Sequence, residues 1–376
     1  MNPKNEMAAV ASPVGADDRQ SPNYHNNSIT DFDEEIKTIE EESAEFLRKM
    51  EPSYMETISM TKLFDSVYQS KPPIIDGLLY RGAYLFVGAP KLGKSFLMAQ
   101  LAYHVSTGTP LWGFPVRQGT VLYLALEDDY RRLQERLYRM FGAAENDNLH
   151  FAVSASQIGK GLDDQLGRFI REHPDTSLVI IDTLQKIREV GGEVYSYASD
   201  YQIITRMKQI ADSYGICLML VHHTRKQKAD DCFDMISGTN GLLGAADGAF
   251  LLQKEQRTSN TGWLEISGRD QQDLRLILKK DEETLCWELE RAETELWKAP
   301  PEPLLEMIAE KITVDCPEWT GSPTELCDFL AVDWKPNVLT QRLNVNASRL
   351  MQEYGIRYFY KRSHAGRRIW LRYEQA

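Results

Sequence analysis

The segment YLFVGAPKLGKSFLMAQLAYHV, residues 84–105, decides how the central part of this 376-residue chain folds. It opens with a short apolar run, Tyr84 to Val87, of the kind found in strands that are buried on both faces. A glycine-containing loop follows at residues 88–95, and the apolar run from Phe96 to Val105 has the length of a helix. A strand, a glycine loop and a helix in this order predict an α/β domain.

The loop of this segment has the spacing G-x-x-x-x-G-K-[ST] and consists of Gly88, Ala89, Pro90, Lys91, Leu92, Gly93, Lys94 and Ser95. A loop of this kind turns backbone N–H groups inward around a phosphate, and the start of the helix adds partial positive charge. We expect Lys94 to reach the terminal phosphates of ATP, Ser95 to offer its hydroxyl to Mg²⁺, and Phe96 to complete the nucleotide-binding set. The alternative is an accidental glycine loop.

Two carboxylates at the ends of other apolar runs extend this predicted site. Asp182 follows Leu178–Ile181 and is the candidate for a second Mg²⁺ ligand. Hydrolysis also needs a carboxylate for the attacking water, and the residue after Asp182 is Thr183 instead of a glutamate. We therefore expect Glu127, which ends another apolar run, to take that role. The alternative is that the acidic run 127–129 solvates a strand end and caps the next helix.

Short apolar runs recur along the chain and alternate with amphipathic stretches, which predicts a mostly parallel sheet covered by helices. The expected strands are Tyr84–Val87, Val121–Leu126, His150–Val153, Leu178–Ile181, Ile216–Val221 and Ala249–Leu252. Three later runs lie close together with short turns between them and are expected to extend the sheet in antiparallel fashion: Trp263–Ser267, Leu274–Lys279 and Thr284–Leu289.

Charge is spread unevenly over the chain. The net charge of −12 argues against a nucleic-acid-binding protein when the chain is taken as a whole. However, residues 31–51 hold nine acidic residues, whereas residues 341–376 hold eight basic and two acidic residues. We expect residues 1–58 to be an acidic, largely disordered tail that serves as a tether or binds a partner.

Hydropathy and cysteine spacing bound the compartment. No run approaches the roughly 18 apolar residues that a membrane helix needs, and the N-terminal residues lack the apolar core of a secretory signal. The five cysteines are widely spaced and form no C-x-x-C pair, which indicates neither a disulfide framework nor a structural zinc. We expect a cytoplasmic protein.

The central residues resemble the RecA-type P-loop ATPases, and most closely the RepA-like replicative helicases of plasmids and other mobile elements. The resemblance covers about residues 60–290 and rests on the segments GAPKLGKS (88–95), LYLALEDD (122–129), VIIDT (179–183) and VHHTRK (221–226). It implies a RecA-like ATPase domain at residues 59–295 and assembly into a ring, usually a hexamer. In such a ring ATP is bound between neighbouring subunits and single-stranded DNA passes through the centre.

The resemblance also implies roles for residues beyond the phosphate loop. His222 matches the position of a polar residue that senses the γ-phosphate, and His223 is the alternative. The segment Arg225 to Asn240 resembles the mobile loop that lines the central pore, although its aspartates dilute its positive charge.

Arg269 falls at the strand end from which ring ATPases supply a basic residue to the site of the adjacent subunit. The alternative is a turn arginine paired with Asp270 or Asp273. Lys279 and Lys280 are weaker candidates for the same role.

The residues after the sheet predict a second, smaller domain. Pro300, Pro301 and Pro303 indicate a linker over residues 296–318, and the domain follows at residues 319–376. Helices are expected to begin at the capping box 322–325, at Pro336 and at Ala347, the last of them capped by Asn346. The runs Ile356–Arg362 and Arg367–Arg372 predict a β-hairpin. Three short helices and a hairpin suggest a winged-helix-like domain.

This domain is basic and aromatic. Its charged residues are Arg342, Arg349, Arg357, Lys361, Arg362, Arg367, Arg368 and Arg372, against Glu353 and Glu374, and Tyr358, Tyr360 and Trp370 interleave with them. Such a mixture suits contact with nucleic acid, including duplex DNA. The residues expected to touch DNA are Arg349 and Gln352 on the third helix and Arg362, His364 and Arg367 on the wing. The alternative is a protein-docking module.

The sequence therefore predicts a DNA-dependent ATPase that uses ATP and Mg²⁺, and specifically a ring helicase for the replication of a mobile element. One alternative is a RecA-type ATPase that remodels or loads proteins on DNA without unwinding it. Another is a DNA-binding regulator that is switched by ATP. The presence of Glu127 and Arg269 favours turnover of ATP over binding alone.

Overall fold

The computed structural model describes residues 43, 46–69, 71–188, 197–224, 233, 236, 240–256, 258–269, 271–293, 301–363 and 366–374. Contacts divide the chain into a unit at Met1–Leu63 and a larger unit at Phe64–Ala376. A short helix, α2 (Met60–Phe64), contains no buried residue. Among the helices of the described residues, none combines the length and apolar character that a membrane span requires.

A nine-stranded sheet forms the centre of the larger unit, in the order β3-β2-β4-β5-β1-β6-β7-β8-β9. Strands β3 to β6 in this order are parallel, and β7, β8 and β9 continue the sheet in antiparallel fashion. The strands are β1 (Gly82–Gly88), β2 (Thr120–Ala125), β3 (Leu149–Ala152), β4 (Thr176–Asp182), β5 (Cys217–His223), β6 (Gly248–Gln253), β7 (Thr261–Gly268), β8 (Gln271–Lys280) and β9 (Trp287–Ala292). The predicted α/β class with a mostly parallel sheet is confirmed.

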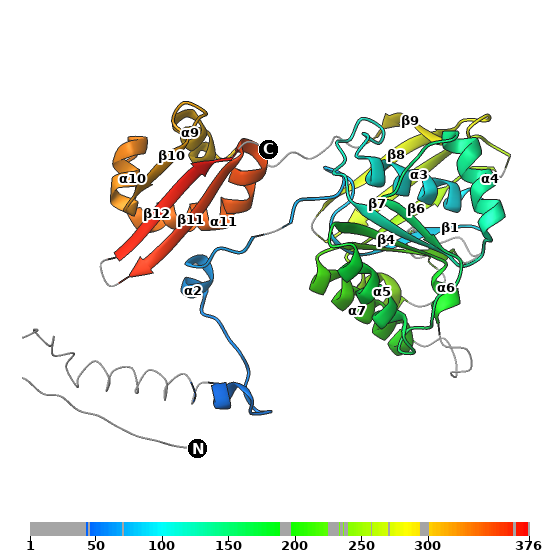
Figure 1. Ribbon diagram of the computed structural model, residues 1–376, viewed down its shortest axis with the longest axis horizontal. Helices are drawn as coiled ribbons and strands as arrows, with labels where there is room; N and C mark the ends of the chain where they lie inside the picture. The colour runs from blue at the N-terminus through cyan, green and yellow to red at the C-terminus, as the bar shows by residue number, and fades with distance from the viewer. Residues whose placement is uncertain are drawn as a thin grey trace, which may run out of the picture. The chain divides into compact units, whose positions relative to one another are not determined.

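Helices cover both faces of this sheet (Figure 1). One face packs against α3 (Lys94–Thr107) and α4 (Tyr130–Phe141), and the other packs against α5 (Leu162–Glu172) and α7 (Tyr197–Tyr214). Two shorter helices are α6 (Leu184–Ile187) and α8 (Asn240–Ala245). Because every residue of β1, β2 and β4 is buried, these strands read in the sequence as continuous apolar runs.

The last strand begins later than the sequence predicts. The expected run starts at Thr284, whereas β9 begins at Trp287. Asp281 Oδ1 accepts hydrogen bonds from the backbone N–H and the hydroxyl of Thr284, each at 2.7 Å. This side-chain turn holds Thr284 out of the ladder, because Asp and Thr compete with strand pairing by bonding to nearby backbone.

The C-terminal domain, residues 301–374, has the element order helix, strand, helix, helix, strand, strand of a winged helix. Its elements are α9 (Pro303–Lys311), β10 (Glu318–Gly321), α10 (Pro323–Leu330), α11 (Pro336–Tyr354), β11 (Ile356–Ser363) and β12 (Gly366–Tyr373). The three strands form an antiparallel sheet in the order β10-β12-β11. The capping box of α10 is present, with Ser322 Oγ accepting from the Glu325 N–H at 3.3 Å and Glu325 Oε2 accepting from the Ser322 N–H at 2.6 Å.

Two features of this domain differ from the prediction. Helix α9 lies within the stretch expected to be a linker, because Pro303 opens it at its first turn and Leu304, Leu305 and Ile308 are buried in the domain core. The two helices expected from Pro336 and Ala347 are one continuous helix, α11. The Asn346 side chain donates to the Arg342 carbonyl at 2.9 Å, four residues back in that helix, and so does not cap a new one.

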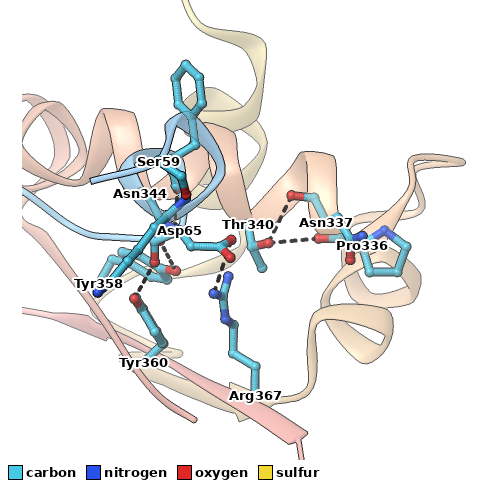
Figure 2. A network of polar contacts seen from close by, with 11 residues as sticks. Ser59, Asp65, Pro336, Asn337, Thr340, Asn344, Tyr358, Tyr360 and Arg367 are labelled. Carbon is cyan, nitrogen blue, oxygen red and sulfur yellow. Dashed lines mark hydrogen bonds and ion pairs between the residues drawn. The ribbon is translucent and has the colours of Figure 1, made fainter. Parts of the chain in front are cut away.

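A segment that precedes the large sheet in the chain binds to the C-terminal domain. The buried Asn344 of α11 donates from Nδ2 to the Phe64 carbonyl at 2.8 Å and accepts from the Tyr358 hydroxyl at 2.8 Å. Val67 packs against the apolar core of the same domain. Figure 2 shows Asn344 and Tyr358 within this network of polar contacts. Residues that are far apart in the sequence thus complete one domain.

Asp65 of this segment occupies two residues that we expected to contact nucleic acid. The Tyr360 hydroxyl donates to the Asp65 carbonyl, and Arg367 Nη2 lies 3.4 Å from Asp65 Oδ1 (Figure 2). Tyr358 is buried in the domain core. The sequence did not indicate these engagements, because each joins segments at opposite ends of the larger unit. His364 lies outside the described residues.

Candidate nucleotide-binding site

The predicted phosphate loop lies at the end of β1, between β5 and β6. Gly88 pairs with His223 on one side and with Leu252 on the other. A Cβ at Gly88 would lie 2.8 Å from the Leu252 carbonyl oxygen, so the position requires glycine. Gly93 has φ +99° and caps α3, so the loop enters the helix through a left-handed residue that glycine adopts without strain.

Lys94 lies inside this loop and is 6% exposed. Its Nζ donates to the carbonyls of Gly88 at 2.8 Å and Ala89 at 3.0 Å. Burial lowers the pKa of Lys94 to about 8, while Asp182 and Glu127 act in the opposite direction. The ammonium form therefore still predominates at neutral pH. A buried cation that bonds to loop carbonyls is placed to bind a phosphate anion within the loop.

Asp182, at the end of β4, accepts two hydrogen bonds on the same oxygen. Ser95 Oγ donates to Asp182 Oδ2 at 2.7 Å, and the Tyr123 hydroxyl donates to it at 2.9 Å. Burial raises the pKa of Asp182, whereas the hydrogen bonds from Ser95 and Tyr123 lower it. The loop and the β4 carboxylate are thus brought together as the sequence predicted.

Tyr123 was not among the predicted site residues. It lies on β2 opposite Ile180, two residues before the position that pairs with Asp182, so its side chain shares a face of the sheet with that carboxylate. The ring is fully buried. Burial first, and then the charge of Asp182, raises the pKa of Tyr123 well above its ordinary value, so the hydroxyl keeps its proton. A polar residue within a buried apolar strand was the available signal.

The acidic run after β2 divides its functions. Glu127 is exposed, and its Oε1 accepts a hydrogen bond from the Thr183 hydroxyl at 3.2 Å, next to Asp182. Asp128 forms an ion pair with Arg136 at 2.7 Å. Asp129 caps α4 by accepting from a backbone N–H of its first turn at 2.9 Å. The capping alternative therefore describes Asp129, while Glu127 lies beside the site.

The two histidines that end β5 occupy different positions. His223 is half-buried, and its Nδ1 lies 3.2 Å from Lys94 Nζ. Burial and the neighbouring Lys94 lower the pKa of His223, which favours the neutral ring at pH 7. His222 is 5% exposed and precedes it on the strand, where successive side chains point to opposite faces. Of the pair, the structure brings His223 to the phosphate loop.

Arg269 lies far from the loop of its own chain. It follows β7, whose last residue Gly268 pairs with Gly248 at the start of β6, whereas Gly88 lies at the opposite edge of the sheet. Its Nη2 donates to the Gly244 carbonyl at 2.8 Å, and the residue is exposed. Lys280 lies at the edge of Gly88, with Nζ 4.2 Å from the centre of the Phe96 ring.

The predicted pore loop lies mostly outside the described residues. Of the segment 225–240, the structure describes only positions 233, 236 and 240. Ile236 is buried and forms an isolated bridge with Thr224. Asp270, the proposed ion-pair partner of Arg269 in the alternative interpretation, is also outside the described part.

Comparison with known proteins agrees with this geometry. Residues 51–229 match the model of a family described as an AAA domain. The chain contains a P-loop ATPase domain. Among solved structures, one of an isolated ATPase domain is 16% identical, with a TM-score of 0.46, and the match covers 68% of this chain and 98% of that one.

A structure titled "The Structure Of A DnaB-Like Replicative Helicase And Its Interactions With Primase" is also 16% identical to this P-loop ATPase chain, with a TM-score of 0.48. That match covers 69% of this chain and 74% of the other. No curated protein sequence gives a significant match. The predicted P-loop ATPase domain is confirmed, and the more specific assignment to replicative helicases stays a prediction.

Proposed function

We propose that this protein is a DNA-dependent ATPase that works as a ring, specifically as a helicase in the replication of a mobile element. The observation that carries the proposal is the contact of Ser95 with Asp182 at 2.7 Å beside the buried Lys94. This contact joins the phosphate loop to a carboxylate from another strand of the sheet. Glu127 lies next to it through its bond with Thr183.

The donor set at this contact fits Mg²⁺. A serine hydroxyl and a buried carboxylate are hard oxygen ligands, and Mg²⁺ in nucleotide sites is held by one or two such groups together with phosphate oxygens. Ser95 and Asp182 would hold the ion, which would neutralise charge on the phosphates. The backbone N–H groups of residues 88–95 and the Lys94 ammonium would bind the phosphates themselves.

Glu127 and His223 have complementary positions for hydrolysis. Glu127 is exposed, so its carboxylate is accessible to a water molecule, and the Thr183 hydroxyl fixes its orientation. We assign to Glu127 the activation of that water. His223 contacts Lys94, so a phosphate bound by Lys94 would alter the environment of the imidazole. We assign the sensing of the γ-phosphate to His223, while His222 stays the sequence-based alternative.

Arg269 supports assembly. Because it lies at the sheet edge opposite Gly88, it can meet a triphosphate only in the site of another copy. We propose that Arg269 of one subunit stabilises charge on the phosphates bound by its neighbour. Closure of such head-to-tail contacts produces a ring, for which a hexamer is the expected assembly. Single-stranded DNA would pass through its centre.

ATPase and strand-displacement assays test the proposal. We expect turnover that single-stranded DNA stimulates, that Lys94→Ala abolishes, and that accompanies displacement of a strand from a forked duplex. Stimulation without displacement would support the remodelling alternative, and ATP binding without turnover would support the ATP-switched regulator.

Mixing variants tests the shared site. Arg269→Ala and Lys94→Ala subunits should each be inactive alone. Their mixture should regain activity, because some interfaces then combine an intact Lys94 with an intact Arg269 of the adjacent copy. A mixture as inactive as its components would contradict a role for Arg269 between subunits.

A further inference from the structure

The C-terminal sheet has one face buried and one face open. Alternate residues of β11 and β12 enter the domain core: Ile356, Tyr358, Ile369 and Leu371. Because side chains alternate along a strand, the residues between them form the opposite face, which we call the outer face: Arg357, Phe359, Lys361, Arg368, Trp370 and Arg372. The outer face thus consists of four cations and two aromatic rings.

The two rings form a flat pair at the centre of the outer face. Phe359 lies directly opposite Trp370 in the ladder. Their ring centres are 5.3 Å apart and their planes differ by 7°. Phe359 is 45% exposed, so part of this aromatic surface is open to a ligand. Neither residue contributes to the apolar core on the other side of the sheet.

Cations of like charge stand opposite one another on both sides of this pair. Arg357 faces Arg372, and Lys361 faces Arg368. Like charges directly across a ladder are unfavourable, so the arrangement is not explained by the stability of the sheet.

Counter-ions compensate one of these two cation pairs. Arg357 lies 2.7 Å from Glu374, and Arg372 lies 3.0 Å from Glu318. Both arginines nevertheless remain more than half exposed. Their guanidinium groups therefore stay accessible to a ligand on the outer face.

The other cation pair has less compensation. Within the described residues, Lys361 and Arg368 have no carboxylate partner at salt-bridge distance. Hydrogen bonds from Ser322 and, more weakly, the charge of Arg368 lower the pKa of Glu325, but that carboxylate is engaged in the α10 capping box. This end of the outer face is suited to an anion.

We infer that the outer face binds single-stranded nucleic acid, with bases stacked on Phe359 and Trp370 and phosphates bound by the flanking cations. Aromatic rings set among Lys and Arg are the usual means of binding single strands, because every base has a stacking face and every nucleotide carries a phosphate. Unpaired bases expose those faces, whereas a duplex hides them. The inference takes its class of ligand from the proposed function but does not depend on ATP hydrolysis.

The helix that we expected to bind DNA offers less. On α11, Arg349 forms an ion pair with Glu353 at 2.8 Å, and Arg342 pairs with Glu302 and lies over the Trp334 ring. Together with the Asp65–Arg367 contact, these pairs leave the outer face as the richer source of unengaged cations and aromatic surface.

Photo-crosslinking locates the strand directly. The full-length protein is irradiated with a short single-stranded oligonucleotide that carries 5-iododeoxyuridine, and the crosslinked peptides are identified by mass spectrometry. We expect crosslinks at Phe359 or Trp370. Crosslinks confined to other parts of the chain, or none at all, would overturn the inference and would leave the outer face to protein docking.

Binding measurements then test the two kinds of contact. Phe359→Leu with Trp370→Leu keeps apolar cover but removes the stacking rings, and should weaken binding of the oligonucleotide by about tenfold or more. Lys361→Gln with Arg368→Gln should reduce the slope of log affinity against log salt by about 1.4, or about 0.7 for each lost phosphate contact. Unchanged affinity and slope in these variants would contradict the inference.

Matched controls come from helix α11. Val345→Ala removes an apolar side chain that is 62% exposed on that helix, and Arg349→Gln removes a cation there. Both should leave affinity for single strands nearly unchanged. A loss with Arg349→Gln as large as that of the outer-face variants would favour the helix as the binding element and overturn the inference.

ATP binding separates this inference from the proposed function. Variants of the outer face should bind ATP normally, because none of them alters the phosphate loop. A protein that lacks ATPase activity but gives the expected crosslinks would retain this inference and lose the proposed function.

Discussion

Tyr123→Phe should destabilise the ATPase domain although it removes a single oxygen atom. The hydroxyl donates to Asp182 Oδ2 at 2.9 Å from a ring with no exposed surface. Removal leaves no cavity larger than that atom, so the cost comes from the hydrogen bond. A bond to a charged partner contributes about 1.5–3 kcal/mol, because the buried carboxylate then loses a donor that water cannot replace.

Thermal unfolding of the nucleotide-free protein measures this cost. For a domain of about 150–250 residues, 1 kcal/mol corresponds to about 2–4 °C in Tm, so the expected decrease is about 3–12 °C. Tyr103→Phe is the matched control, because Tyr103 stacks on Phe141 at 4.0 Å between ring centres while the structure gives its hydroxyl no hydrogen bond among the described residues. This control should change the stability by less than about 0.5 kcal/mol.

A Tyr123→Phe protein as stable as Tyr103→Phe would refute the reasoning. It would mean that Asp182 is satisfied by Ser95 alone, and that the Tyr123 hydroxyl does not contribute to holding the carboxylate. A decrease of similar size in both variants would instead assign the loss to the tyrosine ring contacts.

Three further changes have defined outcomes. Glu127→Gln should retain ATP binding while lowering the rate of turnover by about 10²–10⁴, measured as phosphate release, since a positioned base contributes that much; an unchanged rate would remove Glu127 from the mechanism. Gly88→Ala should abolish ATP binding, measured by calorimetry, because the added Cβ would lie 2.8 Å from a backbone carbonyl; normal affinity would show that the strands can separate freely. Ser322→Ala should lower the stability of the C-terminal domain by about 1 kcal/mol in denaturant titration, through loss of the α10 cap, and a change below about 0.3 kcal/mol would contradict the role of the capping box.

The order of strands and the phosphate loop could be predicted because their signals are local. An apolar run followed by a glycine loop specifies both a buried strand and the turn that ends it, and the run before Asp182 specifies its position at the same sheet edge. The α10 capping box is equally local: two side chains three residues apart define the start of the helix. In each case a short segment contained the whole physical requirement.

Features that depend on distant partners could not be predicted in the same way. Whether His222 or His223 reaches Lys94 is decided by one residue of register at the end of β5, where apolar patterning has already ceased. Asn346 has a side chain that caps helices well, but tertiary packing keeps α11 continuous through it. The sequence left Tyr360 and Arg367 free for DNA, whereas the fold places the distant Asp65 against both of them.

The register of β1 and β5 places Gly88 and His223 side by side, and the chain leaves β5 with the next residue, Thr224. A triphosphate gripped at the loop is thus one residue of covalent backbone away from the segment expected to touch the translocating strand. Force generated by cleavage would need no lever arm or hinge between domains to reach that segment. A displacement of the imidazole would shift the anchor point of that loop itself, so fuel and cargo would share a single strand as their transmission.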